Sequence, residues 1–125
     1  MTFFNILLAV VLGLGLGWIM VRSNSTDYSR IHIINRDDFT KNMRKGQLID
    51  IRKQDQFEAD KIKGARNYKT AELTGKYAKI RKDLPIYLYC NNGKKSKRIA
   101  KSLARKNFKV IYVLEGGLQN FNNPK

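Results

Sequence analysis

Two short, continuously apolar runs constrain the fold of this chain more than any other feature. They occupy residues 85–89 (PIYLY) and 110–114 (VIYVL), and a stretch whose apolar residues have helical spacing, 96–108, lies between them. A strand that is apolar along its whole length is typical of a parallel sheet covered by helices on both faces. These runs therefore predict an α/β fold with a buried, mostly parallel sheet.

The same alternation of strand-like and helix-like segments begins earlier in the chain. Residues 31–34 and 48–51 are strand-like runs, and another strand starts within 64–67. Helix-like stretches follow them at 36–44, 55–60 and 71–82, and the last is expected to be interrupted or shifted at Gly75. We therefore expect residues 31–125 to form a three-layer domain, with a central sheet of about five strands and helices on both faces. In open sheets of this kind the active crevice lies beyond the carboxyl ends of the strands.

Residues 3–21 form an apolar run that contains one strongly polar side chain, Asn5. Its length suits a helix that crosses the hydrocarbon core of a membrane. A cleavable signal peptide is the alternative, but no basic residue precedes the run and no small-x-small cleavage pattern follows it. We therefore expect residues 1–22 to be an uncleaved transmembrane anchor, and residues 23–30 to be a polar linker.

The net charge of +15 arises entirely after the apolar run, since the first charged residue is Arg22. The positive-inside rule then predicts a single-pass protein of the cell membrane, with its N-terminus outside and its domain in the cytoplasm. Such a charge attracts polyanions, so we expect contact with anionic lipids, although a basic surface without a partner is an equal alternative. No motif typical of specific nucleic-acid binding is present. Gly13 and Gly17 form one GxxxG spacing, a weak indication of a dimer.

Cys90 is the only cysteine, and it follows the apolar 85–89 strand directly. A single thiol excludes an intramolecular disulfide, a CxxC redox pair and a cysteine-rich zinc site. We expect neither a metal nor another cofactor. The position of Cys90 places the thiol at the carboxyl end of a strand, where the crevice is predicted.

The loop after Cys90 favours an anion at its sulfur. The unpaired N–H groups and the positive dipole end of the following helix face such an anion. Lys94, Lys95 and Lys97 add positive charge, and Gly93 allows a turn that aims successive N–H groups inward. This cradle suits a thiolate, or a persulfide whose terminal sulfur is also an anion. A buried structural cysteine is the alternative interpretation.

This loop resembles the active-site loop of the rhodanese family, Cys-x-x-Gly-x-Arg-Ser entering a helix. Cys90, Gly93 and Ser96 match the pattern, and Lys95 replaces the usual Arg. The segment 48–67 (LIDIRKQDQFEADKIKGARN) resembles the family's LIDVR…F…HIPGAIN segment.

A third motif resembles the family's closing segment, GG…W. It is Glu115-Gly116-Gly117, which ends in Phe121. The three motifs occur in the family's order, and the resemblance covers about residues 31–121.

The resemblance implies a sulfurtransferase that passes sulfane sulfur through a persulfide on Cys90, the nucleophile. The donor would be a small molecule, thiosulfate or a persulfide, and the acceptor a thiol or another nucleophile. The predicted anion-binding loop comprises Asn91, Asn92, Gly93, Lys94, Lys95 and Ser96. Asp50 and Arg52 match family positions beside the crevice, and a structural ion pair or loop anchor is favoured there over a catalytic role.

Some positions depart from the family pattern. Lys61 and Lys63 replace the usual His and Pro, and Asn91 follows the cysteine where many users of thiosulfate have Arg. Lys95 cannot form the two parallel hydrogen bonds of a guanidinium. The sequence therefore leaves the choice of donor open.

Two other functions share parts of this pattern. A tyrosine-phosphatase-like or arsenate-reductase-like enzyme requires an arginine six residues after the cysteine, and Ser96 stands there. A membrane-tethered sulfur carrier or protein-binding module without turnover would share the same features, and it is the main alternative. His32, the only histidine, is expected at the surface or at the edge of the first strand.

Overall fold

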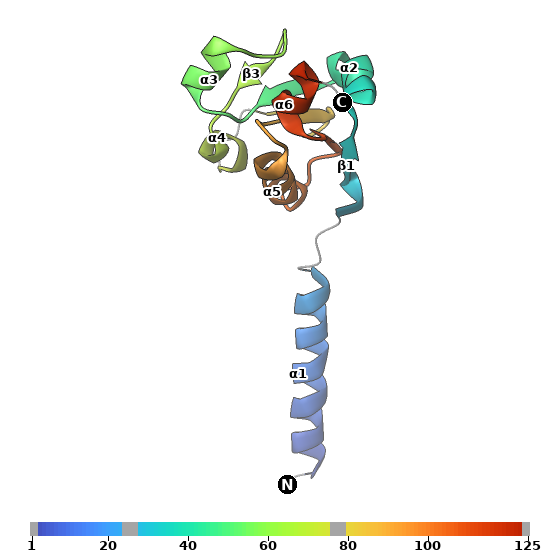
Figure 1. Cartoon of the computed structure of the whole chain (residues 1–125). Coiled ribbons are helices and arrows are strands. Elements are labelled where there is room, and N and C mark those ends of the chain that lie inside the picture. The colour runs from blue at the N-terminus through green and yellow to red at the C-terminus, as the bar shows by residue number, and fades with distance from the viewer. Residues whose placement is uncertain (1–2, 24–27, 76–79, 124–125) are drawn as a thin grey trace.

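A computed structural model of the chain describes residues 3–23, 28–75 and 80–123, and for residues 16–23 it describes the backbone alone. Its centre is a sheet of five parallel strands in the order β1-β5-β4-β2-β3 (Figure 1). The strands are β1 (Ile31–Ile34), β2 (Gln47–Asp50), β3 (Arg66–Asn67), β4 (Ile86–Tyr89) and β5 (Ile111–Leu114). The α/β fold and its five-stranded parallel sheet agree with the prediction.

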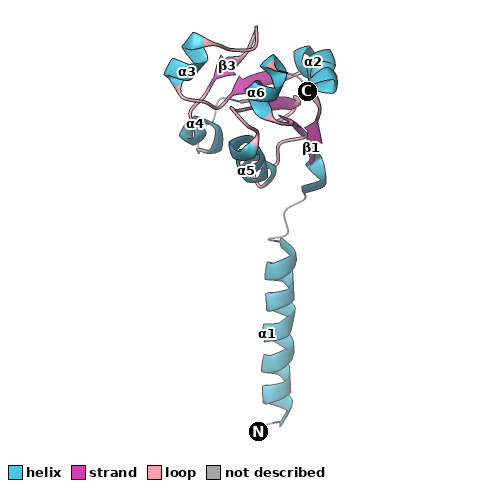
Figure 2. Ribbon diagram, in the orientation of Figure 1, coloured by secondary structure: helices cyan, strands magenta, loops and turns pink. Residues whose placement is uncertain are grey.

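Helices cover both faces of the sheet (Figure 2). The helices are α1 (Phe3–Ser23), α2 (Arg36–Asn42), α3 (Gln54–Ala59), α4 (Thr70–Thr74), α5 (Lys94–Ala104) and α6 (Gly117–Asn122). Two short 3₁₀ turns, η1 (Tyr28–Arg30) and η2 (Met43–Lys45), precede β1 and follow α2.

Strand β4 shows why the central strands are apolar at every position. Ile86 and Leu88 belong to the core cluster that includes α4 and α5 residues, whereas Tyr87 and Tyr89 belong to the cluster that includes α2 and α6 residues. Successive side chains of a strand point to opposite faces, so a strand between two helical layers must be apolar on both. All four residues of β4 are buried.

The helix predicted over 71–82 was expected to be interrupted or shifted at Gly75, and the structure confirms a break at that residue. Helix α4 ends at Thr74, where the N–H of Gly75 donates to the carbonyl of Ala71 and the extended backbone of Gly75 stops the helix. Residues 76–79 of the predicted helix lie outside the described residues. Ile80, by contrast, is buried in the core beside α5 without belonging to a helix.

The N-terminal run folds as α1, and its described apolar side chains, from Phe3 to Leu14, are exposed. Among the described parts of the chain, no helix combines the length and the apolar character needed to cross a membrane. The transmembrane anchor predicted over residues 1–22 stays a prediction. Of the predicted linker, residues 24–27 lie outside the described part. His32 is exposed on the edge strand β1, as predicted.

Candidate active site

The sheet places Cys90 near the middle of its carboxyl edge. Cys90 follows β4 directly, and β4 lies between β2 and β5. The chain then turns within three residues and enters α5 at Lys94. Cys90 is only 3% exposed, so a reactant can reach its sulfur only through a narrow opening or by displacing part of the loop.

Two backbone N–H groups point at the sulfur of Cys90. The N–H of Gly93 lies 3.1 Å from Sγ, and the N–H of Ser96 lies 3.4 Å from it. Gly93 is the N-cap of α5 and Ser96 lies in its first turn, where N–H groups have no partner within the helix and the dipole is positive. The arrangement favours negative charge on the sulfur.

Local sequence explains why the loop takes this shape. Gly93 has a φ of +90°, in the left-handed region that glycine adopts without steric cost. The side-chain oxygen of Asn92 accepts a hydrogen bond from the N–H of Lys94 at 3.0 Å, which stabilises the turn. The N–H of Lys94 is thus occupied, and the donors to the sulfur come from Gly93 and Ser96 instead.

The remaining loop side chains point to different neighbours. Lys95 Nζ donates to the carbonyl oxygen of Ile51 at 3.3 Å, and Asn91 Nδ2 lies 3.5 Å from the side-chain oxygen of Gln56. Lys94 is exposed. Asn91 and Lys95 therefore join the loop to the segment that follows β2.

Ser96 is fully buried, and its hydroxyl oxygen has no hydrogen-bond partner in the described structure. An unpaired buried hydroxyl costs free energy, and such groups in native proteins call for an explanation. Because the N–H of the same residue already reaches Cys90, this hydroxyl is a candidate donor to a sulfur bound there.

The Glu115-Gly116-Gly117 motif and the residues after it hold the cysteine loop through backbone contacts, a role that the sequence did not predict. A Cβ atom on Gly117 would lie 2.5 Å from the carbonyl oxygen of Cys90 and 2.6 Å from backbone atoms of Asn91. The N–H groups of Leu118 and Gln119 donate to the carbonyls of Cys90 and Asn91 at 2.8 and 3.0 Å. The sequence signal for this role was the glycine pair itself, since only glycine permits the two backbone segments to approach so closely.

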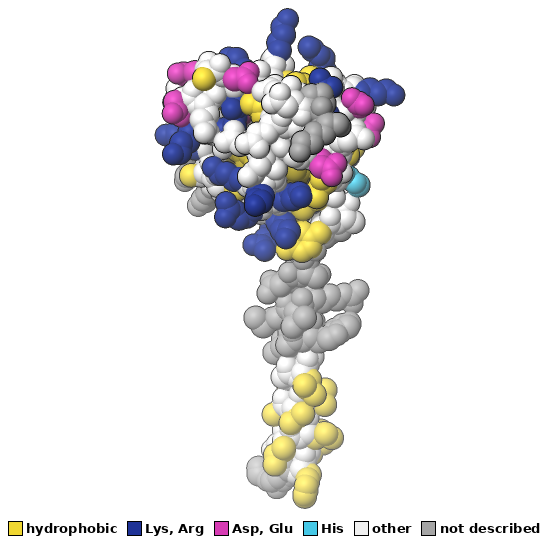
Figure 3. Space-filling view, in the orientation of Figure 1, with side chains coloured by type: hydrophobic (Ala, Val, Ile, Leu, Met, Phe, Trp, Pro, Cys, Tyr) yellow, Lys and Arg dark blue, Asp and Glu magenta, His cyan; other side chains and the backbone are white. Residues whose placement is uncertain are grey.

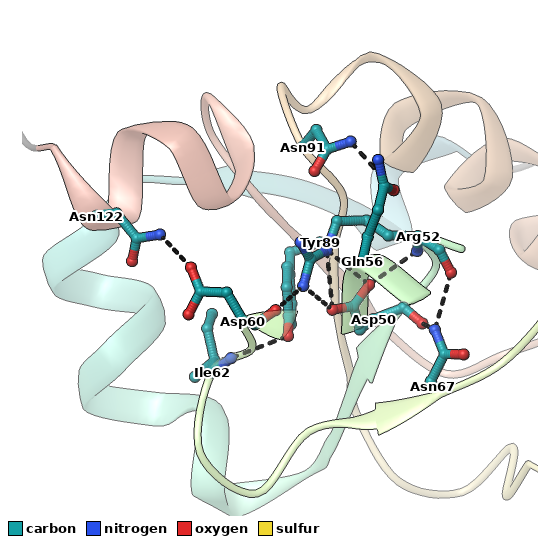
Figure 4. A network of polar contacts seen from close by, with 9 residues as sticks. All are labelled: Asp50, Arg52, Gln56, Asp60, Ile62, Asn67, Tyr89, Asn91 and Asn122. Atoms are coloured by element: carbon teal, nitrogen blue, oxygen red, sulfur yellow. Dashed lines mark hydrogen bonds and ion pairs between the residues drawn. The ribbon is translucent and has the colours of Figure 1, made fainter. Parts of the chain in front are cut away.

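Asp50 and Arg52 form a buried ion pair beside this loop (Figure 4). The Nη2 atom of Arg52 lies 2.8 Å from Oδ2 of Asp50, and the backbone N–H of Arg52 donates to Oδ1 of Asp50 at 2.8 Å. Burial alone would lower the pKa of Arg52, but the hydrogen bonds and the charge of Asp50 outweigh it and raise that pKa. Asn67 Nδ2 donates to the backbone carbonyls of both residues.

The ion pair extends into a network that reaches α6 (Figure 4). Arg52 also donates to the backbone carbonyl of Asp60, and the carboxylate of Asp60 accepts from Asn122 at 2.9 Å. The Tyr89 hydroxyl accepts from the N–H of Ile62 at 3.1 Å, and burial raises the pKa of Tyr89 far above its ordinary value. These contacts fix the segments around the Cys90 loop, and within the described residues the hydrogen bonds to the sulfur come from Gly93 and Ser96 rather than from Asp50 or Arg52.

Fold and site together define an α/β protein that presents a single thiol at the carboxyl edge of a parallel sheet, against the start of a helix. The chain belongs to the rhodanese-like domain family, which matches residues 35–124. It is 39% identical over 88 residues to the uncharacterized protein YqhL of Bacillus subtilis, with 70% of each chain covered.

Two further relatives extend the comparison. The chain is 32% identical over 74 residues to the thiosulfate sulfurtransferase GlpE of Coxiella burnetii, which covers 59% of this chain and 69% of that protein. The fold is similar to that of a rhodanese-related protein from Thermoplasma volcanium, with a TM-score of 0.66 and 22% identity. That similarity covers 73% of this chain and 90% of the other.

Proposed function

We propose that this domain is a sulfurtransferase that carries sulfane sulfur as a persulfide on Cys90 and passes it to a thiol or another nucleophilic acceptor. The observation that carries the proposal is the pair of N–H groups, from Gly93 and Ser96, directed at Cys90 Sγ. The relationship to a protein named thiosulfate sulfurtransferase supports the same chemistry.

The reaction proceeds in two displacements that balance without an external oxidant or reductant. In the first, the Cys90 thiolate attacks the sulfane sulfur of the donor and forms an S–S bond. The donor's own bond to that sulfur breaks, and its electron pair leaves with sulfite or with the donor thiolate. In the second, an acceptor thiolate attacks the outer sulfur, the bond to Sγ breaks, and Cys90 regains its electron pair.

The N–H groups at the start of α5 support both displacements. Sγ is negatively charged before the first step and again after the second, and between the steps the outer sulfur carries the charge. Fixed N–H groups stabilise such charge without reorganising during the reaction. The single cysteine leaves no internal thiol to take the sulfur, so the acceptor must be a separate molecule.

The donor is a persulfide or thiosulfate. Lys95 is bound to the carbonyl of Ile51, so it must leave that contact to bind the sulfonate of thiosulfate. A lysine also offers a point charge where a guanidinium would offer two parallel hydrogen bonds. Both features favour a persulfide donor.

The second candidate function is a sulfur carrier or protein-binding module without turnover. The 3% exposure of Cys90 is the observation that favours it, since a nearly closed thiol restricts the approach of reactants. A carrier would accept one sulfur atom and release it only to a docked partner.

Intact-mass measurement on the full chain, exposed separately to thiosulfate and to glutathione persulfide, tests the proposal. We expect a gain of one sulfur atom in the wild type and none in Cys90→Ala, followed by repeated turnover when dithiothreitol is added. A single loading without turnover supports the carrier. Absence of loading from both donors, or equal loading of Cys90→Ala, would contradict sulfur transfer altogether.

A further inference from the structure

The exposed side of α5 is strongly basic. No acidic residue occurs between Asp83 and Glu115, and this stretch contains eight lysines and arginines. Those with exposed side chains are Lys94, Lys97, Arg98, Lys101, Arg105 and Lys109, and we call this surface the α5 basic face. Figure 3 shows dark blue side chains gathered on the lower part of the folded domain, where Figure 1 places α5.

Among the described residues, no cation of the α5 basic face forms an ion pair, although Lys109 interacts electrostatically with Asp83. In the described structure, the ion pairs join Arg36 to Asp37, Arg52 to Asp50 and Arg81 to Asp83, and none includes a residue of this face. Like charges held close together on one helix repel one another unless a partner of opposite charge covers them. The face therefore fits an anionic surface.

The N-terminal segment joins the domain next to this face. Arg105, at the end of α5, donates to the hydroxyl of Tyr28 at 3.4 Å, and η1, which begins at Tyr28, packs against α5. Five peptide steps separate Ser23, the last residue of α1, from Tyr28, and they can span at most about 18 Å. Whatever surface holds α1 thus lies close to the α5 basic face.

The described side chains of α1 indicate which kind of surface holds this helix. From Phe3 to Gly15 the helix has one strongly polar residue, Asn5, and all of these residues are exposed. A helix that is apolar on all sides needs an apolar surrounding, whereas an amphipathic helix needs a groove on one side only. A lipid bilayer provides that surrounding, and anionic headgroups at its surface attract nearby lysines and arginines.

From these observations we infer that the α5 basic face binds the anionic headgroups of a lipid bilayer in which α1 is embedded. One apolar anchor together with a basic patch gives stable attachment where either alone is weak. The short connection at Tyr28 holds α5 toward the bilayer and thereby sets the orientation of the domain. This inference concerns attachment and is independent of the chemistry at Cys90.

Co-sedimentation of the full chain with two kinds of vesicle tests the inference. One kind contains phosphatidylcholine alone, and the other contains phosphatidylcholine mixed with phosphatidylglycerol. Leu8→Lys combined with Val11→Lys weakens insertion of α1, whose described side chains are exposed, and so isolates the contribution of the α5 basic face. We expect this double variant to lose binding to phosphatidylcholine and to keep salt-sensitive binding to the mixed vesicles.

Charge reversal then locates the contact. In the Leu8→Lys, Val11→Lys background, Lys97→Glu with Lys101→Glu should weaken binding to the mixed vesicles by more than about tenfold. Lys41→Glu with Lys63→Glu changes the net charge equally at exposed positions outside α5, and it should weaken binding by less than about twofold. Lys97→Gln with Lys101→Gln should give an intermediate loss, while circular dichroism checks that each variant is folded.

Several results would overturn the inference. Equal losses from the two charge-reversed pairs would show that net charge alone drives binding, and equal binding to both kinds of vesicle would exclude an anionic headgroup site. Tighter binding of the α1 variant to an oligonucleotide or an acidic peptide than to the mixed vesicles would assign the face to that partner. If the wild-type chain does not bind phosphatidylcholine vesicles and elutes as a dimer, a second copy of the chain covers α1.

Discussion

The backbone N–H of Leu118 donates to the carbonyl oxygen of Cys90 at 2.8 Å. This bond attaches the start of α6 to the residue that carries the sulfur. Gly117 makes the approach close enough, since a side chain there would overlap the backbone of Cys90 and Asn91. The shape of the cysteine loop therefore depends on a segment from the far end of the domain.

Gly117→Ala should slow sulfur loading of Cys90 by more than about tenfold, because the added Cβ displaces the loop that holds the two N–H donors. It should also destabilise the fold by about 1–3 kcal/mol, as a non-glycine residue at a φ of +64° is strained. Loading rates by mass spectrometry and urea unfolding measure the two effects.

Gly64→Ala is the matched control for that variant. Gly64 also has a positive φ, +89°, but no atom lies within 4 Å of the Cβ it would carry. This variant should show the backbone strain without the change in loading rate. Equal loading rates for Gly117→Ala and the wild type would refute the role assigned to α6.

Asp50→Asn should destabilise the domain by about 3–5 kcal/mol, because it leaves the buried Arg52 without its counter-charge. Denaturant unfolding monitored by circular dichroism measures the loss. Asp83→Asn breaks an ion pair with Arg81 in which both side chains are 64% exposed, and it should leave stability essentially unchanged. Similar losses in the two variants would mean that burial does not determine the strength of the Asp50–Arg52 pair.

Tyr89→Phe should cost about 1–3 kcal/mol at neutral pH, because the N–H of Ile62 loses its acceptor. The difference in unfolding free energy between the wild type and Tyr89→Phe should become smaller at alkaline pH. Burial raises the pKa of Tyr89 in the folded state, whereas in the unfolded chain the phenol ionises at about pH 10. Above that pH the unfolded state binds fewer protons than the folded state, so this group lowers wild-type stability as pH rises, and phenylalanine cannot.

Urea unfolding of both proteins between neutral pH and about pH 11 measures this effect. A difference between wild type and Tyr89→Phe that stays constant across the range would show that Tyr89 ionises equally in both states.

Lys95→Arg should lower the KM for thiosulfate by about tenfold, since a guanidinium adds a second charge-assisted hydrogen bond to a sulfonate. The kinetics with a persulfide donor, which lacks that group, should change little. Steady-state rates with both donors provide the measurement. Equal changes in KM for the two donors would mean that residue 95 acts on the structure of the loop, through the contact of Lys95 with Ile51, and not on the sulfonate.

Local patterns in the sequence were enough to predict the layered parallel architecture, the place of Cys90 at a strand end and the start of a basic helix after it. These features depend on local periodicity: residues 86–89 are all apolar because both faces of β4 are covered, and Gly93 permits the turn that follows. The interruption of the helix predicted over 71–82 is local in the same way, because Gly75 ends α4.

The contacts that hold the site together come from the tertiary fold. The strand order β1-β5-β4-β2-β3 brings Gly117 against Cys90, and it brings Asp60 between Arg52 and Asn122. Such contacts join residues far apart in the chain, and their energies depend on close packing and on removal from water. Patterns of neighbouring residues contain no information on close packing or on removal from water. The sequence could therefore indicate the nucleophile but not the contacts that hold its loop in place.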